Sequence, residues 1–368
     1  MVKSFKNLFG KSNKGVGIEI APQRVNVVKL RKQRQGLKLD SLTSVPVPEG
    51  IFVEGQIANP AAMAQLIQQA LSESKIKADR VATAVPGRDS IVRLIPVPAE
   101  LDDQELRDMV LNHEAGLYLP YAREEADVDY QKLGYFVDED GIEKVQVLLV
   151  ATRKEVTDTY ISTFELAGLQ VDVLEINSFA LIRTIREQLR QYGPQEAGVL
   201  VDIEFDSTEI AIILNGVPQF SRTVPIGTYQ MQTALARAMN LPASRDTQLL
   251  QGMTIPLDLT EGDKTGITEA NPGMASMMRV LGELTDELRR SIDFYLNQAL
   301  DLEIAQILLA GPGGGLAQIN EFFTQRLNLP AIQIDPVTAL SLQVDEEKYP
   351  LVERPGLGIV LGLAMREA

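Results

Sequence analysis

The chain has 368 residues, of which 45% are hydrophobic and 23% charged, and its formal net charge is −15. It has no cysteine and a single histidine, His113, which excludes disulfides and thiolate catalysis and disfavours histidine-built metal sites or catalytic triads. The negative charge disfavours general nucleic-acid binding, which needs cations to neutralise phosphates. No apolar run approaches the roughly 20 residues of a membrane span, so we expect a cytoplasmic protein of about two domains.

The first 14 residues form a basic segment. Four lysines alternate there with phenylalanine and leucine, and the first acidic residue of the chain is Glu19. Such a segment is suited to contact an anionic membrane surface or a partner. A disordered polar tail is the alternative interpretation.

A three-stranded meander is predicted after this segment. Residues 17–30 contain a short apolar strand with one acid, Glu19, followed by a polar turn and an alternating strand. A second turn at 35–36 leads to the third strand. Beyond it, apolar periodicity predicts helices at 59–74, 102–115, 154–167 and 179–192, and strands at 81–85, 128–133, 145–151 and 171–176.

The same plan recurs about 183 residues later. Residues 200–214 contain an apolar strand with one acid, Asp202, a polar turn and an alternating strand. Asn215-Gly216 follows, and an Asn-Gly pair between alternating apolar residues is a strong hairpin signal. We therefore predict two related halves that each begin with a meander.

The rest of the second half alternates helices with strands. Helical patterns cover 228–240, 277–300, 319–327 and 357–366, and strands are predicted at 305–310 and near Ile332. Residues 251–274 are polar with scattered glycine and proline, which predicts a mobile loop.

A glycine-rich turn, ILLAGPGGG, ends the strand at 305–310. Glycine is retained where the backbone takes an unusual dihedral or approaches another group closely. The turn lacks the Lys-Ser/Thr pair of a phosphate loop. It indicates either a closely approached ligand or close packing of strand and helix.

The two acid-bearing hairpins and the glycine turn resemble the actin/Hsp70/sugar-kinase superfamily. The resemblance implies an α/β, actin-like two-domain fold with duplicated RNase H-like halves that face each other across a nucleotide. Within it, the chain is similar to the PilM family of type IV pilus assembly proteins. The matching segments are NHEAGLYLPYAREEADVDYQKLG (Asn112–Gly134), VLEINSFALIRTI (Val173–Ile185) and ELRRSIDFY (Glu287–Tyr295).

The resemblance implies FtsA/PilM-type subdomains 1A, 1C, 2A and 2B. Subdomain 1A would cover 15–98 and 170–197, and subdomain 1C would cover 99–169. Subdomain 2A would cover 198–227 and 303–350, and subdomain 2B would cover 228–302. The basic tail would be 1–14, and 351–368 would form a C-terminal helix that packs on 1A.

The resemblance also implies a site for ATP and Mg²⁺. The residues that match cofactor-binding positions are Glu19, Gln23, Arg24, Asp202, Ser207, Thr208, Gly227, Glu287, Arg290, Ser291, Gly311, Gly313, Gly314 and Gly315. Glu19 and Asp202 would hold the magnesium ion, through water. Two departures stand out: Pro22 removes an amide from the first turn, and Glu204 stands where a glycine is usual. A solvated helix face is the alternative for the three residues at 287–291.

The implied function is that of an adaptor. It would bind the N-terminal cytoplasmic peptide of PilN in a groove between subdomains 1A and 1C and would connect assembly ATPases to the inner membrane. It would thereby support pilus biogenesis and twitching motility from the cytoplasmic face of that membrane. No catalytic residue is assigned, and we expect ATP to act as a ligand with weak or absent turnover.

Two other functions remain open from the sequence. A small-molecule kinase of the same superfamily would need a catalytic aspartate and a sugar-binding insertion, and neither has a convincing candidate. An FtsA-like filament protein would end in an amphipathic membrane helix after a linker, whereas 357–366 resembles a packed element.

Overall fold

The computed structural model describes residues 15–34, 36–242, 244–256, 272–298 and 301–367. The predicted basic tail, most of the loop expected at 251–274 and the last residues of the helix expected at 277–300 lie outside these ranges. The described chain forms two five-stranded sheets and one three-stranded sheet, besides a small two-stranded ribbon. Among its helices, none is both long and apolar enough to cross a membrane.

The first five-stranded sheet has the order β10-β6-β1-β2-β3. Strands β1, β2 and β3 form the predicted antiparallel meander, and β6 and β10 extend the sheet in parallel. The strands are β1 (Val16–Ile20), β2 (Arg24–Gln33), β3 (Gly36–Pro46), β6 (Arg80–Val85) and β10 (Gln170–Ile176). Helices α1 (Pro60–Glu73) and α4 (Lys154–Leu166) bury their apolar sides against one face.

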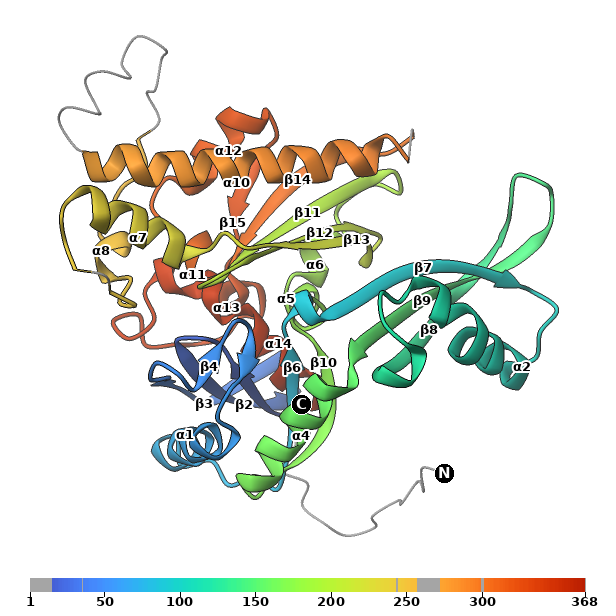
Figure 1. Cartoon of the computed structure of the whole chain (residues 1–368), viewed down its shortest axis with the longest axis horizontal. Coiled ribbons are helices and arrows are strands. Elements are labelled where there is room, and N and C mark those ends of the chain that lie inside the picture. Colours follow the sequence, from blue (N-terminus) through green and yellow to red (C-terminus); the bar gives the residue numbers. More distant parts are fainter. Residues whose placement is uncertain (1–14, 35, 243, 257–271, 299–300, 368) are drawn as a thin grey trace.

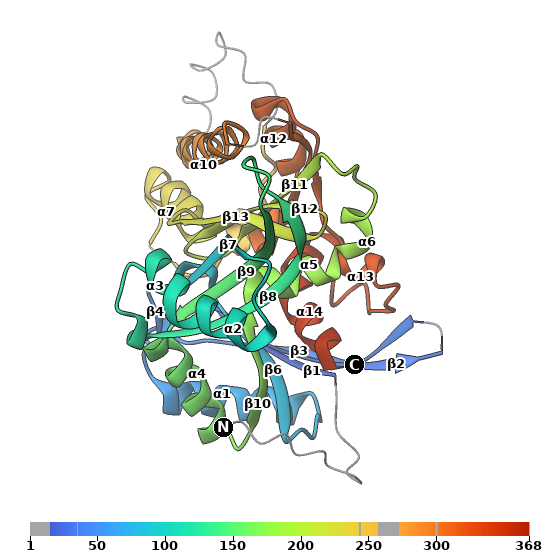
Figure 2. The same ribbon diagram turned by 90° about the vertical axis from the view of Figure 1, so that its right-hand side faces the viewer.

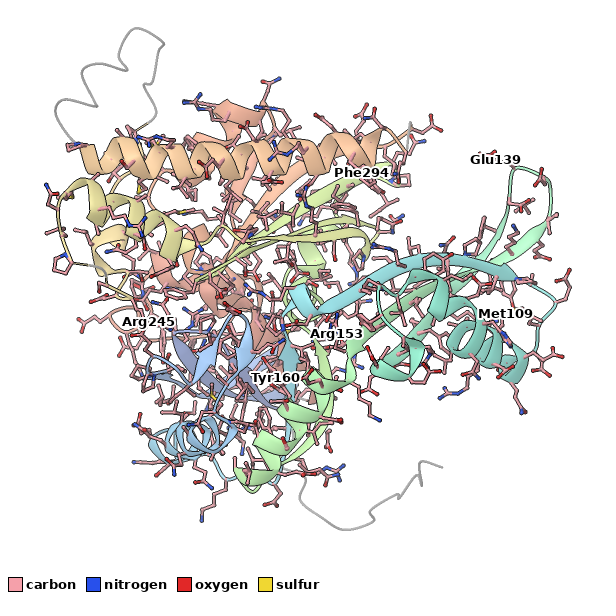
Figure 3. The ribbon with its side chains drawn as sticks, in the orientation of Figure 1. Met109, Glu139, Arg153, Tyr160, Arg245 and Phe294 are labelled. Carbon is pink, nitrogen blue, oxygen red and sulfur yellow. The ribbon has the colours of Figure 1, made fainter. Side chains whose placement is uncertain are left out.

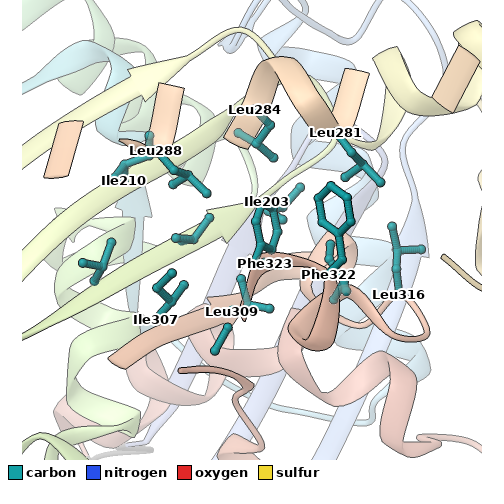
Figure 4. Packing of buried hydrophobic residues seen from close by; sticks show 14 of the residues in the cluster. Ile203, Ile210, Leu281, Leu284, Leu288, Ile307, Leu309, Leu316, Phe322 and Phe323 are labelled. Carbon is teal, nitrogen blue, oxygen red and sulfur yellow. The ribbon is translucent and has the colours of Figure 1, made fainter. Parts of the chain in front are cut away.

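The second sheet repeats this order as β13-β12-β11-β14-β15. Its strands are β11 (Glu196–Ile203), β12 (Thr208–Leu214), β13 (Val217–Val224), β14 (Glu303–Ala310) and β15 (Ala331–Gln333). Asn215 and Gly216 both have positive φ, as the predicted hairpin turn requires. The outer face packs against α7 (Thr228–Ala238), α10 (Pro272–Leu296) and α12 (Ile319–Leu327), with Phe323 and Leu288 in the core (Figure 4).

Two helices between the sheets join the halves. α5 (Asn177–Thr184) and α14 (Gly358–Glu367) contribute to one cluster that contains side chains of both sheets. α5 and α14 touch because glycine leaves room: a Cβ at Gly362 would overlap the Ala180 carbonyl oxygen. Gly17 in β1 lets α14 approach the first sheet in the same way, since a Cβ there would lie 2.6 Å from the Ala364 nitrogen. The first half lies below the second in Figure 1, and the joining helices lie between them.

The three-stranded sheet projects to one side of the halves in Figure 1 and lies in front of them in the turned view of Figure 2. Its order is β7-β9-β8, with β7 (Ser90–Pro98), β8 (Ala126–Val137) and β9 (Glu143–Arg153). The helix expected at 102–115 is divided into α2 (Asp103–Asp108) and a π-helical turn (Met109–Glu114), and α3 (Ala115–Tyr118) follows. These segments pack on the buried side chains of β7 and β9.

Short elements connect the three units. The helical ones are η1 (Gly87–Asp89), η3 (Arg123–Glu125), α6 (Arg186–Leu189), α8 (Gln248–Gln251), α11 (Gly311–Gly314), α13 (Pro336–Ala339) and η4 (Leu351–Leu357). β4 (Phe52–Val53) and β5 (Gln56–Ile57) pair in the two-stranded ribbon. The helix expected at 179–192 is α5 and α6, separated at Ile185.

Candidate functional site

The acids of the two meanders meet between the halves. Glu19 in β1 and Asp202 in β11 are only 2% and 3% exposed. Asn26, opposite Glu19 in the meander, donates a hydrogen bond of 3.0 Å to its carboxylate. The residue opposite Asp202 is another acid, Glu209, and the Oδ1 of Asp202 is buried without a hydrogen-bond partner. The structure therefore places both predicted acids in one site.

A small cavity of about 40 Å³ lies at this meeting point. Its lining comes from both halves and includes Glu19, Asp202, Glu204, Asp206 and Glu209 together with Arg88. A bulk water molecule takes roughly 30 Å³, whereas pockets for small ligands are typically about 300–1,000 Å³. The cavity has room for ordered water and not for a nucleotide.

Arg24 stands between the acids of the two halves. Its guanidinium lies 4.0 Å from the carboxylate of Glu19 and 3.9 Å from that of Glu204. It also donates a hydrogen bond of 3.2 Å to the Gly356 carbonyl oxygen in η4. Because a cation in this position attracts carboxylates on both sides, Arg24 connects the first half to the second.

The cluster of carboxylates is costly to ionise. Burial raises the pKa of Asp202 well above its ordinary value, and Glu204, Glu209 and Glu19 raise it further. Burial raises the pKa of Glu204 to about 7, although Arg24 acts in the opposite direction. Burial also raises the pKa of Glu19, and Arg24 and Asn26 oppose that rise. Buried like charges favour the protonated form, so the site holds protons that exposed carboxylates would release.

The polar residues of the second hairpin are engaged within the chain. Ser207 donates to Asp206 at 3.2 Å, and Thr208 donates to the Ile226 carbonyl oxygen at 2.6 Å. Gly227 precedes α7, and a Cβ there would lie 2.5 Å from the Glu204 carbonyl oxygen. These three predicted residues therefore belong to the neighbourhood of Asp202.

The glycines of the predicted adenosine turn are packed against protein. Gly311 has φ of +73°, and a Cβ there would lie 2.7 Å from Asp202 and 2.5 Å from the Ile203 carbonyl oxygen. One at Gly313 would overlap the Ile203 side chain, and one at Gly314 would lie 2.9 Å from the Leu309 carbonyl carbon. One at Gly315 would overlap the Val352 carbonyl oxygen of η4. The groups that approach these glycines closely are therefore other parts of the same chain.

The three predicted residues of the second-half helix lie in a different environment. Glu287 forms ion pairs with Arg222 at 2.9 Å and with Arg290 at 2.6 Å. Ser291 is buried in α10 and donates to the Glu287 carbonyl oxygen. None of the three lines the cavity at Glu19 and Asp202. The structure therefore does not bring them together with the hairpin acids.

The arrangement around the cavity does not fit ATP with Mg²⁺. Five carboxylates face it, whereas a triphosphate needs cations and free amides. Within the described residues, no group of three or more His, Asp or Glu side chains is placed to hold a metal ion. The turn that would lie below the adenosine is covered by η4.

Several residues of the site escaped the sequence analysis. Arg88 in η1 forms an ion pair of 2.9 Å with Asp206, and Arg245 donates to the Pro22 carbonyl oxygen at 2.8 Å. Gln23, a predicted site residue, donates to the Arg245 carbonyl oxygen at 2.5 Å. Glu209 had a signal, because it is a charged residue in an otherwise apolar strand. The two arginines had none, since their partners are distant in the sequence.

A second polar surface lies where the three-stranded sheet meets the first half. This junction groove is lined by residues of η3, β9 and α4, namely Glu124, Glu125, Arg153, Lys154, Glu155 and Asp158. The Arg153 guanidinium lies 4.5 Å from the centre of the Tyr121 ring, and Figure 3 shows Arg153 at this junction. Carboxylates outnumber cations in the groove four to two, which favours a ligand with positive charge.

Two α/β halves of the same strand order, with buried acids facing each other between them, define an actin-like protein. A family model described as type IV pilus assembly protein PilM matches residues 17–262 and 274–368. The chain therefore belongs to the PilM family of type IV pilus assembly proteins.

Several solved structures are similar to this chain. A PilM–PilN type IV pilus biogenesis complex matches at 26% identity and a TM-score of 0.78, covering 97% of this chain and 99% of that chain. The ethanolamine utilization protein EutJ from Carboxydothermus hydrogenoformans matches at 13% identity and a TM-score of 0.48, covering 95% and 88% of the two chains. MreB5 of Spiroplasma citri, bound to ADP, matches at 12% identity and a TM-score of 0.48, covering 89% of this chain and 94% of that chain.

Proposed function

We propose that the protein is an adaptor of the type IV pilus inner-membrane assembly platform and binds the N-terminal cytoplasmic peptide of PilN. The observation that carries the proposal is the match to the PilM–PilN complex over 97% of this chain. The protein would sit on the cytoplasmic face of the inner membrane through PilN. There it would contact other platform proteins and assembly ATPases, and so support pilus biogenesis and twitching motility.

The junction groove is the peptide site that the structure supports best. It lies between the three-stranded sheet, which holds most of the expected subdomain 1C, and α4, which packs on the first half although the predicted boundaries assign it to that subdomain. An extended peptide would gain affinity from its backbone and specificity from its side chains. The excess of carboxylates in the groove predicts cationic side chains on the peptide.

A charge reversal on α4 tests this site. Asp158→Lys should weaken binding of a synthetic PilN N-terminal peptide at least tenfold, because it replaces attraction by repulsion in the groove. Glu165→Lys is the matched control: Glu165 is on the same helix and exposed, but does not line the groove. Isothermal titration of both variants and the wild type measures the effect.

Three outcomes are informative. If only Asp158→Lys loses affinity for the peptide, the result supports the junction groove as the peptide site. Equal affinities in all three proteins would place the peptide elsewhere on the surface. No binding of the peptide to wild-type protein would contradict the adaptor function itself.

ATP with Mg²⁺ remains a prediction for this chain. Its support is the position of Glu19 and Asp202, which face each other as the two hairpin acids of an actin-like protein do. Binding would require the halves to separate, because the present cavity holds only about 40 Å³. Isothermal titration with ATP and ADP in the presence of magnesium tests the prediction, and no measurable heat of binding would contradict it.

A further inference from the structure

Three arginines cross from one half of the molecule to the other. Arg24 of the first half lies between Glu19 of its own half and Glu204 of the second. Arg88 of the first half pairs with Asp206 of the second at 2.9 Å. Arg245 of the second half donates to Pro22 of the first at 2.8 Å. Contacts therefore run in both directions across the same boundary.

The three contacts occupy different parts of that boundary. Arg24 lies at the centre, beside the buried acids, and donates a hydrogen bond to the Gly356 carbonyl oxygen in η4. Arg88 pairs with the turn of the second hairpin. Arg245 contacts the turn of the first hairpin, where its carbonyl oxygen also accepts a hydrogen bond from Gln23, and Figure 3 shows it at the boundary between the halves.

The arginines are also positioned by their surroundings. The Arg245 guanidinium lies 4.9 Å from the centre of the Phe205 ring, and Phe205 lies in the turn of the second hairpin. Arg24 and Arg88 are each about one-fifth exposed, at 22% and 23%. Ion pairs shielded from water are screened less by salt than surface pairs. These contacts are therefore stronger candidates for holding two bodies together than exposed pairs are.

We propose that Arg24, Arg88 and Arg245 form an arginine closure that holds the two halves together without any nucleotide. The positive charge between the two hairpins is supplied by arginine side chains of the protein itself. The turns that would otherwise face phosphate are engaged with Arg24 and Arg245, and Glu204 is drawn toward Arg24. The closure concerns the nucleotide site only in that the halves must part before ATP could enter.

The absence of cysteine makes the closure measurable. Ser72→Cys on α1 and Arg237→Cys on α7 introduce two exposed attachment points for spin labels. These helices belong to different halves and lie on opposite sides of the boundary between them (Figure 1). The distance between the labels, measured without nucleotide, reports whether the halves are together.

The test variant is the triple substitution Arg24→Ala, Arg88→Ala and Arg245→Ala. The labelled protein with all three arginines should give one narrow distance distribution, and the triple variant a longer and broader one. The control removes three arginines whose ion pairs stay within one half: Arg31→Ala, Arg190→Ala and Arg289→Ala. It loses the same charge and should keep the narrow distribution.

Either of two results would overturn the closure. One is an unchanged distribution in a triple variant whose circular dichroism shows that it is folded. The other is an open distribution in the unmodified protein that narrows only when ATP and magnesium are added. If the triple variant does not fold, Asp206→Asn removes the partner of Arg88 and must broaden the distribution by itself. The separate titration with ATP tests the nucleotide prediction independently of the distances between the spin labels.

Discussion

At the scale of single residues, the unusual feature is a group of buried acids with too few cations. Glu209 is 8% exposed, its Oε1 has no hydrogen-bond partner, and Gly87 approaches it so closely that a Cβ there would overlap its carboxylate. Burial raises the pKa of Glu209 to about 6, and Ser178 opposes that rise. A group in this position costs stability when it is ionised.

Glu209→Gln should therefore stabilise the protein at high pH. The folded protein keeps the Glu209 proton at pH values where the unfolded chain has lost it. Stability contributed by this group thus falls as pH rises from about 4.5 to about 6 and stays low above that. A rise in pKa from 4.5 to about 6 corresponds to about 2 kcal/mol at pH 8.

Urea unfolding of both proteins at pH 4 and pH 8 measures this effect. The variant should exceed the wild type in free energy of unfolding at pH 8 and match it at pH 4. A difference that is the same at both pH values would show that the amide, and not the ionisation, is responsible.

A second prediction at the residue scale concerns the glycine turn. Gly315→Ala should lower the free energy of unfolding by about 2 kcal/mol or more, because its Cβ would overlap the Val352 carbonyl oxygen and η4 would have to shift. Gly282→Ala in α10 is the control, since no atom lies within 4 Å of its added Cβ. Alanine there should stabilise the helix by about 0.5–1 kcal/mol. Thermal unfolding of both variants distinguishes a tight contact from a general intolerance of alanine.

At the scale of elements, local patterns identified most strands and helices. α12 has the bounds predicted, and the Asn-Gly turn closes the second hairpin as expected. β7 received no prediction because Pro96 and Pro98 interrupt its pattern. Proline is tolerated there because β7 is an edge strand, where a missing donor is not needed by a neighbour.

The subdomain boundaries remain predictions with two suggested changes. β7 pairs along its whole length with β9, and the predicted boundary at residue 99 would assign it to subdomain 1A. The predicted boundary at residue 169 would assign α4 to subdomain 1C, although α4 packs in the core of the first half. We therefore propose that subdomain 1C begins at Ser90 and ends at Arg153. The other boundaries lie close to element ends, such as residue 228 at the start of α7.

At the scale of the whole molecule, long-range contacts decide what the site is. Arg24 contacts Gly356, which is 332 residues away, and Arg245 contacts Pro22, which is 223 residues away. The sequence placed Glu19 and Asp202 in equivalent hairpins and so predicted that they would meet. It also indicated Arg24 as a site residue, but it contained no signal for Arg88 or Arg245.

The sequence by itself determined the two meanders, most helices and the membership of a family, because each depends on local periodicity, turn residues or contiguous motifs. Only the tertiary structure decided that η4 covers the glycine turn, that Glu287 pairs with Arg222, and that arginines join the two halves. The physical reason is that the contacts of η4 and of the arginines depend on how the two sheets pack around α5 and α14, and the Glu287–Arg222 pair depends on how α10 packs on the second sheet. That packing brings together side chains whose spacing along the chain has no regular pattern.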